Sequence, residues 1–216
     1  MKNILITILL LSLTLFSFSG KTFEGEVTYK ISYKNLPEEM GMYKAMLPKK
    51  TKLTLKGEWS KMQQNMGIFA KTNVIHNSKT KKSIVLMNLL GKKFAVESVD
   101  TTKTSDHGSY SVKELKDIKV IAGYKCNKVI ISDSSENNIT IWITKKLPTY
   151  KNSSLPSVKL KGFPMEYHIE KDGMTLRVSA TKVNKKNIKD KEFAIPKGYE
   201  KKTPEEMEKM MKGIKL

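Results

Sequence analysis

Side chains of alternating polarity recur along most of this chain, and a period of two restricts those segments to extended strands. Residues 23–34 are the longest example, with Phe, Val, Ile and Tyr on one face and Glu, Thr and Lys on the other. Residues 51–59 and 61–69 alternate in the same style, and strands are also predicted at 124–132 and 138–144. Such strands have one apolar face that must be covered and one that contacts water. The pattern predicts a mostly β fold with antiparallel strands.

The hairpin around Asp172-Gly173 has a register that follows from its sequence. A two-residue Asp-Gly turn lets the strand partners be counted outward from it. The predicted pairs are Ile169 with Leu176, Tyr167 with Val178 and Met165 with Ala180 on one face, and Glu170 with Thr175, His168 with Arg177 and Glu166 with Ser179 on the other. One face is apolar and the other polar, and a slip of one residue would mix them, so the register is well specified.

Other segments are predicted from turn residues and helix caps. Gly91 indicates a hairpin between 83–90 and 94–99, residues 100–111 are polar and loop-like, and residues 193–195 form a last short strand before Pro196. There is no internal repeat, no alternation of strands with helices and no Gly-rich phosphate loop.

Two helices are predicted, one early and one at the end of the chain. Asn35, Pro37 and Glu38 offer a cap, an early proline and a capping-box acid for a short helix at about 36–47. Thr203-Pro-Glu-Glu206 is a capping box that begins an amphipathic helix over 203–216.

The apolar face of the sheet can be covered in two ways. Either the sheet folds on itself as a sandwich or closed barrel, or it stays open and curved with the helices as its lid. The two amphipathic helices favour the second arrangement, because each has an apolar stripe that needs a partner. We therefore predict one domain over 21–202, a curved antiparallel half-barrel, with the helix at 203–216 completing its cover.

The first 20 residues have the features of a secretory signal peptide. Lys2 is followed by a nearly unbroken apolar run from Ile4 to Phe18, with small residues that suit cleavage after Ser19 or Gly20. A transmembrane anchor is the competing interpretation, but the run is shorter than the roughly 20 residues that a bilayer requires. The sequence predicts export to the periplasm or outside the cell.

Cysteine usage and charge limit the classes of function. The only cysteine is Cys126, which excludes a disulfide framework, a multi-cysteine metal site and a lipoprotein anchor at the predicted cleavage point. After removal of Lys2, 39 basic and 21 acidic residues remain, a net charge of +18. A general solubilising Lys bias is the preferred explanation of this charge, with anionic partners such as an envelope surface as the alternative. Arg177 is the one arginine, and arginine is the residue preferred for reading phosphates and bases, so nucleic acid is not expected.

Two groups of side chains outside the apolar face could suggest a metal site or a reactive thiol, and both have an ordinary structural explanation. Glu166, His168 and Glu170 share a strand face and superficially resemble a metal-ligand set, but Arg177 opposite His168 disfavours a cation and favours an exposed ion-pair ladder. Cys126 is expected to be a buried small apolar residue, with a reactive thiol as the alternative. No metal, cofactor or catalytic residue is predicted.

The segment Ile121-Ala-Gly-Tyr-Lys-Cys-Asn-Lys128 resembles the "GYxC" signature of an uncharacterised family of exported bacterial proteins. Residues 162–165, 167–173 and 193–199 match the C-terminal half of that family, and the similarity extends thinly over 23–205. The chain is also similar to the related secreted family named for a GLPGLI motif, which is absent here. The family resembles the periplasmic lipoprotein-carrier (Lol-type) fold, a half-barrel whose concave apolar face has a helical lid. This resemblance implies an envelope protein that carries or senses lipid-like molecules, and it implies no catalytic residues.

These observations predict a non-catalytic protein that binds an apolar or amphiphilic ligand, such as an acyl chain, between sheet and helices. Methionine is flexible and polarizable and suits a surface that repacks around guests, although Met at helical spacing also simply fills cores. The predicted ligand-binding residues are Met40, Tyr43, Leu47, Met207, Met210 and Met211 from the helices and Tyr29, Ile31, Leu55 and Trp59 from the sheet. The alternative is a structural or interaction module of the cell envelope with a filled core and a Lys-rich docking surface.

Overall fold

The computed structural model describes residues 16–19, 23–67, 70–99, 110–132, 138–152, 160–171 and 174–213. The predicted signal peptide lies outside these residues except for 16–19. The Asp172-Gly173 turn and His107 lie outside them as well.

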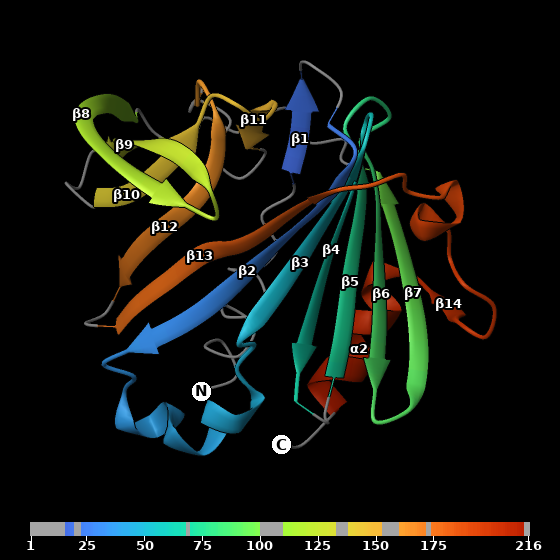
Figure 1. Cartoon of the computed structure of the whole chain (residues 1–216). Helices are drawn as coiled ribbons and strands as arrows, with labels where there is room; N and C mark the ends of the chain where they lie inside the picture. The colour runs from blue at the N-terminus through green and yellow to red at the C-terminus, as the bar shows by residue number, and fades with distance from the viewer. Residues whose placement is uncertain are drawn as a thin grey trace.

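One large sheet of twelve strands makes up most of the described chain (Figure 1). Its strands, in spatial order, are β14 (Glu200–Lys202), β7 (Lys92–Val99), β6 (Lys82–Leu89), β5 (Ala70–Asn77), β4 (Trp59–Met66), β3 (Lys50–Lys56), β2 (Gly25–Lys34), β13 (Met174–Lys185), β12 (Phe163–Lys171), β10 (Asn138–Thr144), β9 (Tyr124–Ser132) and β8 (Ser111–Ile121). All neighbours are antiparallel except β14, which pairs parallel with β7. In the described part, β14 and β8 form two separate edges, so the sheet is not closed into a barrel. A mostly β fold with a large open antiparallel sheet is confirmed.

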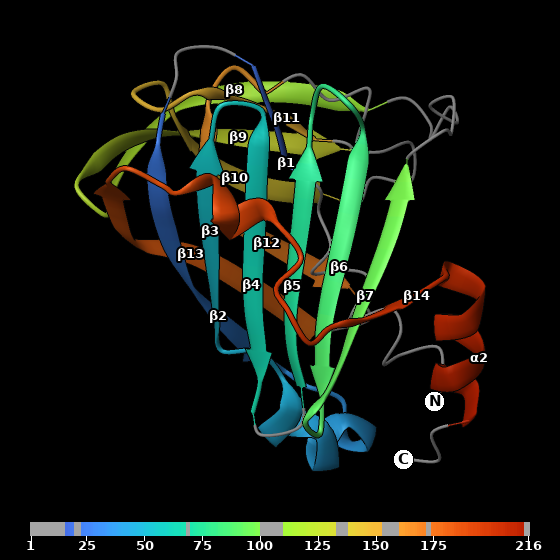
Figure 2. The ribbon, with the colours of Figure 1, turned by 90° about the vertical axis from the view of Figure 1, so that its right-hand side faces the viewer.

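The sheet bends so that its two halves face each other. Figure 2 shows β3 to β7 side by side nearest the viewer, with β8, β9, β10 and β12 crossing behind them. The largest apolar cluster draws its side chains from both halves: Val27, Leu53 and Met62 come from β2 to β4, while Val129 and Ile141 come from β9 and β10. The halves of one sheet therefore pack on each other through this core.

The inner face of β2 to β7 is the face that points toward the other half of the sheet. One line of cross-strand partners runs along it. In order across the sheet, these are Val27, Leu53, Met62, Val74, Val85 and Val96. Because neighbouring residues of a strand point to opposite faces, Ile75, Ile84 and Ala95 lie on the outer face. Both faces are therefore apolar at β5 to β7, and each needs a cover.

Two segments near the C-terminus supply those covers. The helix α2 (Pro204–Gly213) packs Met207 on the inner-face residues Met87, Phe94 and Val96. The 3-10 helix η2 (Asp190–Phe193) packs Phe193 on the outer-face cluster. Figure 2 shows η2 in front of β4 and α2 beyond the β7 edge. The capping box of α2 forms as predicted, because Thr203 N donates to Glu206 Oε2 (2.7 Å) and Glu206 N donates to Thr203 Oγ1 (3.1 Å).

The predicted register of the β12–β13 hairpin is confirmed for the five pairs from Glu166–Ser179 to Glu170–Thr175. The predicted hairpin between β6 and β7 is also present, with Leu90 and Gly91 as its turn and both at positive φ. These elements were predictable because alternation and a short turn leave only one register that keeps the faces separate.

Two predicted elements differ in the structure, and one strand was not predicted. The early helix is a 3-10 helix, η1 (Glu38–Met46), without a side-chain cap; Asn35 has a positive φ of 51° and is not its N-cap. It is bounded by prolines and contains Gly41, and a 3-10 helix presents no continuous amphipathic stripe. The strand predicted at 193–195 is wrong, because Phe193 ends η2. Strand β8 was not predicted, since its charged residues interrupt the alternation.

Candidate ligand-binding face

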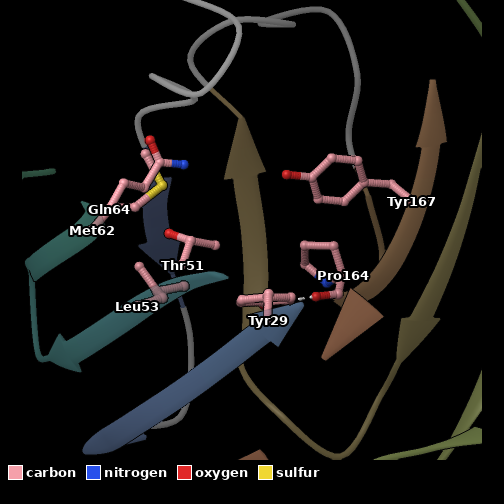
Figure 3. Close-up of a pocket in the computed structure, with 7 residues that line it drawn as sticks. All are labelled: Tyr29, Thr51, Leu53, Met62, Gln64, Pro164 and Tyr167. Atoms are coloured by element: carbon pink, nitrogen blue, oxygen red, sulfur yellow. Dashed lines mark hydrogen bonds between the residues drawn. The ribbon is translucent and has the colours of Figure 1, made fainter. Parts of the chain in front are cut away.

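A small cavity lies on the inner face where β2, β3 and β4 meet β12 (Figure 3). It is lined by Tyr29, Thr51, Leu53, Met62, Gln64, Pro164 and Tyr167. Figure 3 shows Tyr167 on one side of this space and Met62 and Gln64 on the other. Its volume of about 10 Å³ is room for about one water molecule. The full-length chain therefore does not hold an open space for an acyl chain at this place.

Hydrogen bonds hold the cavity walls in position. The Tyr29 hydroxyl donates to the Pro164 carbonyl oxygen at 3.0 Å and joins β2 to β12 across the intervening β13. The Thr51 hydroxyl donates to the Gln63 carbonyl oxygen at 3.1 Å and joins β3 to β4. Burial raises the pKa of the Tyr167 phenol, so this group stays neutral and available as a donor.

A two-stranded sheet bridges the two halves of the large sheet on the inner side. It consists of β1 (Phe16–Ser19) and β11 (Thr149–Asn152), which pair antiparallel. Strand β1 contacts β4 and β5, and β11 contacts β12. Figure 1 shows the pair standing between β3–β5 and β10–β12. Residues 16–19 belong to the predicted signal peptide, so a segment expected to be removed lies against the inner face.

The predicted ligand-binding residues are spread over several places. Tyr29, Ile31 and Leu55 are buried on the inner face, and Tyr29 lines the cavity. Met207 and Met210 lie farther along that face on α2, against β6 and β7. Met40 and Leu47 are buried, but η1 lies beyond the ends of β2 and β3 and does not cover the face (Figure 1). The side chains of Tyr43 and Met211 are outside the described residues.

Trp59 was predicted on the inner face and the structure places it on the other. The turn at Gly57-Glu58 pairs Trp59 with Lys56, so it points to the outer face, where its ring stacks on Phe193 at 5.7 Å between centroids. Alternation carried from Leu53 and Leu55 through Gly57 to Trp59 predicts the wrong side, because the chain reverses at this turn. Leu53, Met62 and Tyr167 line the cavity in its place. Reading Gly57 as a turn would have identified the correct face of β4.

We expect Trp59→Ala and Phe193→Ala each to lower the free energy of unfolding by about 2 kcal/mol, because each removes a large ring from the outer cluster. The double variant should lose about 1 kcal/mol less than the sum, since the first replacement already removes the ring contact. Urea unfolding of the four proteins measures this coupling. Strict additivity would mean that the stacked pair does not form in solution.

The polar face of β12 carries a buried carboxylate. Glu166 is 1% exposed, and the exposed ion-pair ladder predicted at this position is therefore wrong. Its Oε1 accepts from Lys119 Nζ (2.7 Å) and lies 3.0 Å from His168 Nε2, and its Oε2 accepts from Arg177 Nη2 (2.8 Å). Burial raises the pKa of Glu166, but hydrogen bonds from Lys119, Ser179, His168 and Arg177 outweigh it and lower the pKa to about 2. The Glu166 carboxylate is therefore charged, and both of its oxygens accept hydrogen bonds.

This ionic cluster joins strands that are distant in the sheet. Lys119 belongs to β8, and two strands separate β8 from the β12 strand of Glu166. Lys119 Nζ also lies 5.4 Å from the centroid of the Trp142 ring. The contact of β8 with β13 shows that the sheet edge curls back over this face. The cluster therefore stabilises the curled edge of the sheet. It was not predicted from the sequence, because Lys119 and Glu166 are far apart in the chain and come together only when the sheet curls.

Cys126 is fully buried, as expected for a small apolar residue. Its Sγ lies 3.3 Å from the Tyr124 carbonyl oxygen. Burial raises the pKa of the thiol to about 11, with a smaller contribution from the charge of Glu166. A thiol in this state is not a nucleophile at neutral pH.

The described residues show neither a cluster of metal-ligand side chains nor a helix that could span a membrane. No group of three or more His, Cys, Asp or Glu side chains there could hold a metal ion. His76 is buried, with its Nδ1 3.0 Å from Ser83 Oγ. None of the helices in the described part has the length and apolarity that a membrane crossing requires.

Comparison with known families identifies residues 23–154 as a match to the model described as "Domain of unknown function (DUF4412)". The chain belongs to this family. The DUF4412 match contains β2 to β11, including the cavity residues of β2 to β4, Cys126 and the 121–128 segment. The segments 162–165, 167–173 and 193–199, on which the sequence resemblance also rests, lie beyond the matched residues, as do Glu166 and Arg177.

No curated protein matches the chain. Among solved structures, the chain is similar to LprF from Mycobacterium bovis, with 10% sequence identity and a TM-score of 0.35 over 82% of this chain and 90% of LprF.

Proposed function

We propose that this DUF4412 protein is exported and, after removal of residues 1–20, binds an acyl chain or another lipid-like molecule on its inner face. The observation that carries the proposal is the position of β1, which contacts β4 and β5 on that face. Once β1 is cleaved away, β11 loses its partner strand and the surface under β1 is open to another apolar occupant. The function is binding without catalysis, in the periplasm or outside the cell.

The chemistry of the inner face supports an apolar guest. Leu53, Met62 and Val74 are neighbouring cross-strand partners there, and each is at most 6% exposed in the full-length chain. Uncovering them would cost roughly 25 cal/mol for each Å² of apolar surface returned to water. A ligand that buries the same surface recovers that free energy. Thr51, Gln64 and Tyr167 supply the few polar groups that can orient the head of an amphiphile.

Helix α2 closes the other end of this face. Met207 is 6% exposed and packs on Met87 and Phe94. Methionine contacts are adaptable, which suits a lid that repacks around different chains. We also propose that the chain is related to the GLPGLI-type families and to the lipoprotein-carrier fold. The proposal further includes a weak attraction of the Lys-rich surface to anionic lipid.

We expect the chain beginning at Lys21 to bind a fluorescent fatty-acid probe, and the full-length chain to bind it at least about tenfold more weakly because β1 competes for the face. Deletion of 203–216 should abolish uptake by the shorter chain, since it removes the lid and exposes Met87 and Phe94. Titration of probe fluorescence measures all three. Equal binding by the full-length and shortened chains would contradict the role of β1.

A point variant separates loss of the lid from loss of folding. Met207→Asp undocks α2 while keeping the helix, and Lys209→Asp changes an exposed residue of the same helix as its control. We expect only Met207→Asp to weaken probe binding, with circular dichroism of both proteins unchanged. Unchanged uptake in Met207→Asp and after the deletion would remove α2 from the site.

The small cavity volume favours a second candidate, a structural or interaction module with a filled core. Native mass spectrometry of the protein after gentle purification from its exporting host distinguishes the two. Co-purified lipid supports the carrier. A ligand-free mass with a persistent protein partner supports the module.

A further inference from the structure

Strand β8 is an edge strand of the large sheet, and several of its apolar side chains are exposed to solvent. Within the described residues β9 is the one strand that is hydrogen-bonded to it. Val112, Ile118 and Val120 are 43%, 53% and 69% exposed, and they are three of the five exposed large apolar residues of the described chain. An edge strand with unpaired backbone groups and exposed apolar side chains is a template for another strand.

We propose that β8 pairs antiparallel with β8 of a second copy of this chain, about a two-fold axis through Leu115. The two large sheets then join edge to edge. This interface is separate from the inner face and does not depend on the proposed function.

The charge pattern of β8 is self-complementary in this register. A two-fold axis perpendicular to the sheet keeps equivalent faces together only when one residue lies opposite its own copy. With Leu115 on the axis, the pairs across the interface are Lys113 with Asp117, Glu114 with Lys116 and Val112 with Ile118, each made twice. Opposite charges and apolar residues facing each other are the pairs that stabilise antiparallel strands.

Other registers lose this complementarity. An axis at Lys113, Glu114, Lys116, Asp117 or Lys119 sets a charged residue against its own copy. An axis at Ile118 sets Lys116 against Val120, so it keeps one kind of opposite-charge pair, Asp117 with Lys119, where the Leu115 axis has two. Like charges directly opposite are destabilising, so Leu115 is the favoured axis.

The shape of β8 limits the strength of this pairing. The β8–β9 register shifts by two residues between Glu114 and Ile118, so β8 bulges away from β9 around Leu115. The bulge sits on the proposed axis, and both copies carry the same bend, as a two-fold relation requires. Bulges and lysines also restrain edge strands from uncontrolled association. We therefore expect a weak, closed dimer with a dissociation constant in the micromolar range.

Cysteine cross-linking tests the register directly. Opposite residues of antiparallel strands have Cα atoms about 4.5–5.5 Å apart, within the range that a disulfide spans. Under mild oxidation Leu115→Cys should form a covalent dimer. Val120→Cys, more exposed on the same strand, should not, because its two copies would lie roughly 33 Å apart. The unmodified chain is the background control, since Cys126 is buried.

Charge reversal tests the same contact without a covalent bond. In sedimentation equilibrium, Asp117→Lys should raise the dissociation constant of the dimer at least about tenfold, and Lys113→Asp combined with Asp117→Lys should restore it. Lys125→Asp, exposed on β9 and away from the pairing, is the matched control. A chain that stays monomeric at every concentration, as it would if another protein supplied the pairing strand, overturns the proposal. So does equal cross-linking of Val120→Cys, or failure of the double variant to restore the dimer.

Discussion

Replacement of Glu166 by glutamine should lower the free energy of unfolding by about 2–3 kcal/mol at pH 7. The side chain keeps its size, so no cavity forms, but the charge that Lys119 and Arg177 pair with is removed. Hydrogen bonds between charged groups are about twice as strong as those between neutral groups. The glutamine amide also places an N–H donor beside Lys119 and Arg177, which can only donate. Chemical denaturation with urea measures the loss.

Glu170→Gln is the control for this variant. Glu170 lies four residues along on the same polar face of β12 but is exposed, and an exposed charge contributes little to stability. We expect a change within about 0.5 kcal/mol. A loss of similar size in both variants would mean that the buried cluster has no special role.

The same carboxylate predicts how stability depends on pH. The pKa of Glu166 is about 2 in the folded chain, against 4.5 for the unperturbed group, so its contribution is complete above about pH 4.5. It is lost as the pH falls from 4.5 toward 2, because the unfolded chain then binds a proton that the folded chain does not. The loss amounts to at most about 3.5 kcal/mol, since one pKa unit corresponds to about 1.4 kcal/mol. In Glu166→Gln this part of the acid dependence should be absent.

Gly25→Ala should destabilise the chain by about 3 kcal/mol or more, as a result of one close approach between strands. A Cβ on Gly25 would lie 2.3 Å from the Asn184 carbonyl oxygen and 3.0 Å from the Lys185 Cα, so the backbone of β13 would have to move away from β2. The φ angle of Gly25, 155°, is also one that other residues rarely adopt. Thermal and urea unfolding both measure the effect.

Gly41→Ala is the matched control for that variant. A Cβ on Gly41 meets nothing within 4 Å. Alanine there restricts the unfolded chain without straining the folded one, so stability should stay the same or rise by about 0.5 kcal/mol. Equal losses at both positions would contradict the close packing of β2 on β13.

The site was only partly predictable from the sequence. Tyr29, Ile31 and Leu55 were placed on the correct face because they belong to uninterrupted alternating strands. Trp59 was not, because a two-residue turn reverses the chain just before it and resets which face its strand presents. A polarity pattern with a period of two residues identifies the face of a residue only relative to its own strand.

The amino-acid sequence by itself determined the strands that alternate without interruption, the register of the β12–β13 hairpin and the cap of α2, because alternation, a two-residue turn and a capping box act over a few neighbouring residues. Tertiary structure alone decided that Glu166 is buried, that Trp59 and Met207 cover opposite faces, and that β8 is an open edge. These outcomes depend on how the sheet bends, and bending brings together residues as distant as Lys119 and Glu166. Contacts of that range result from the packing of the whole sheet and leave no local pattern in the chain.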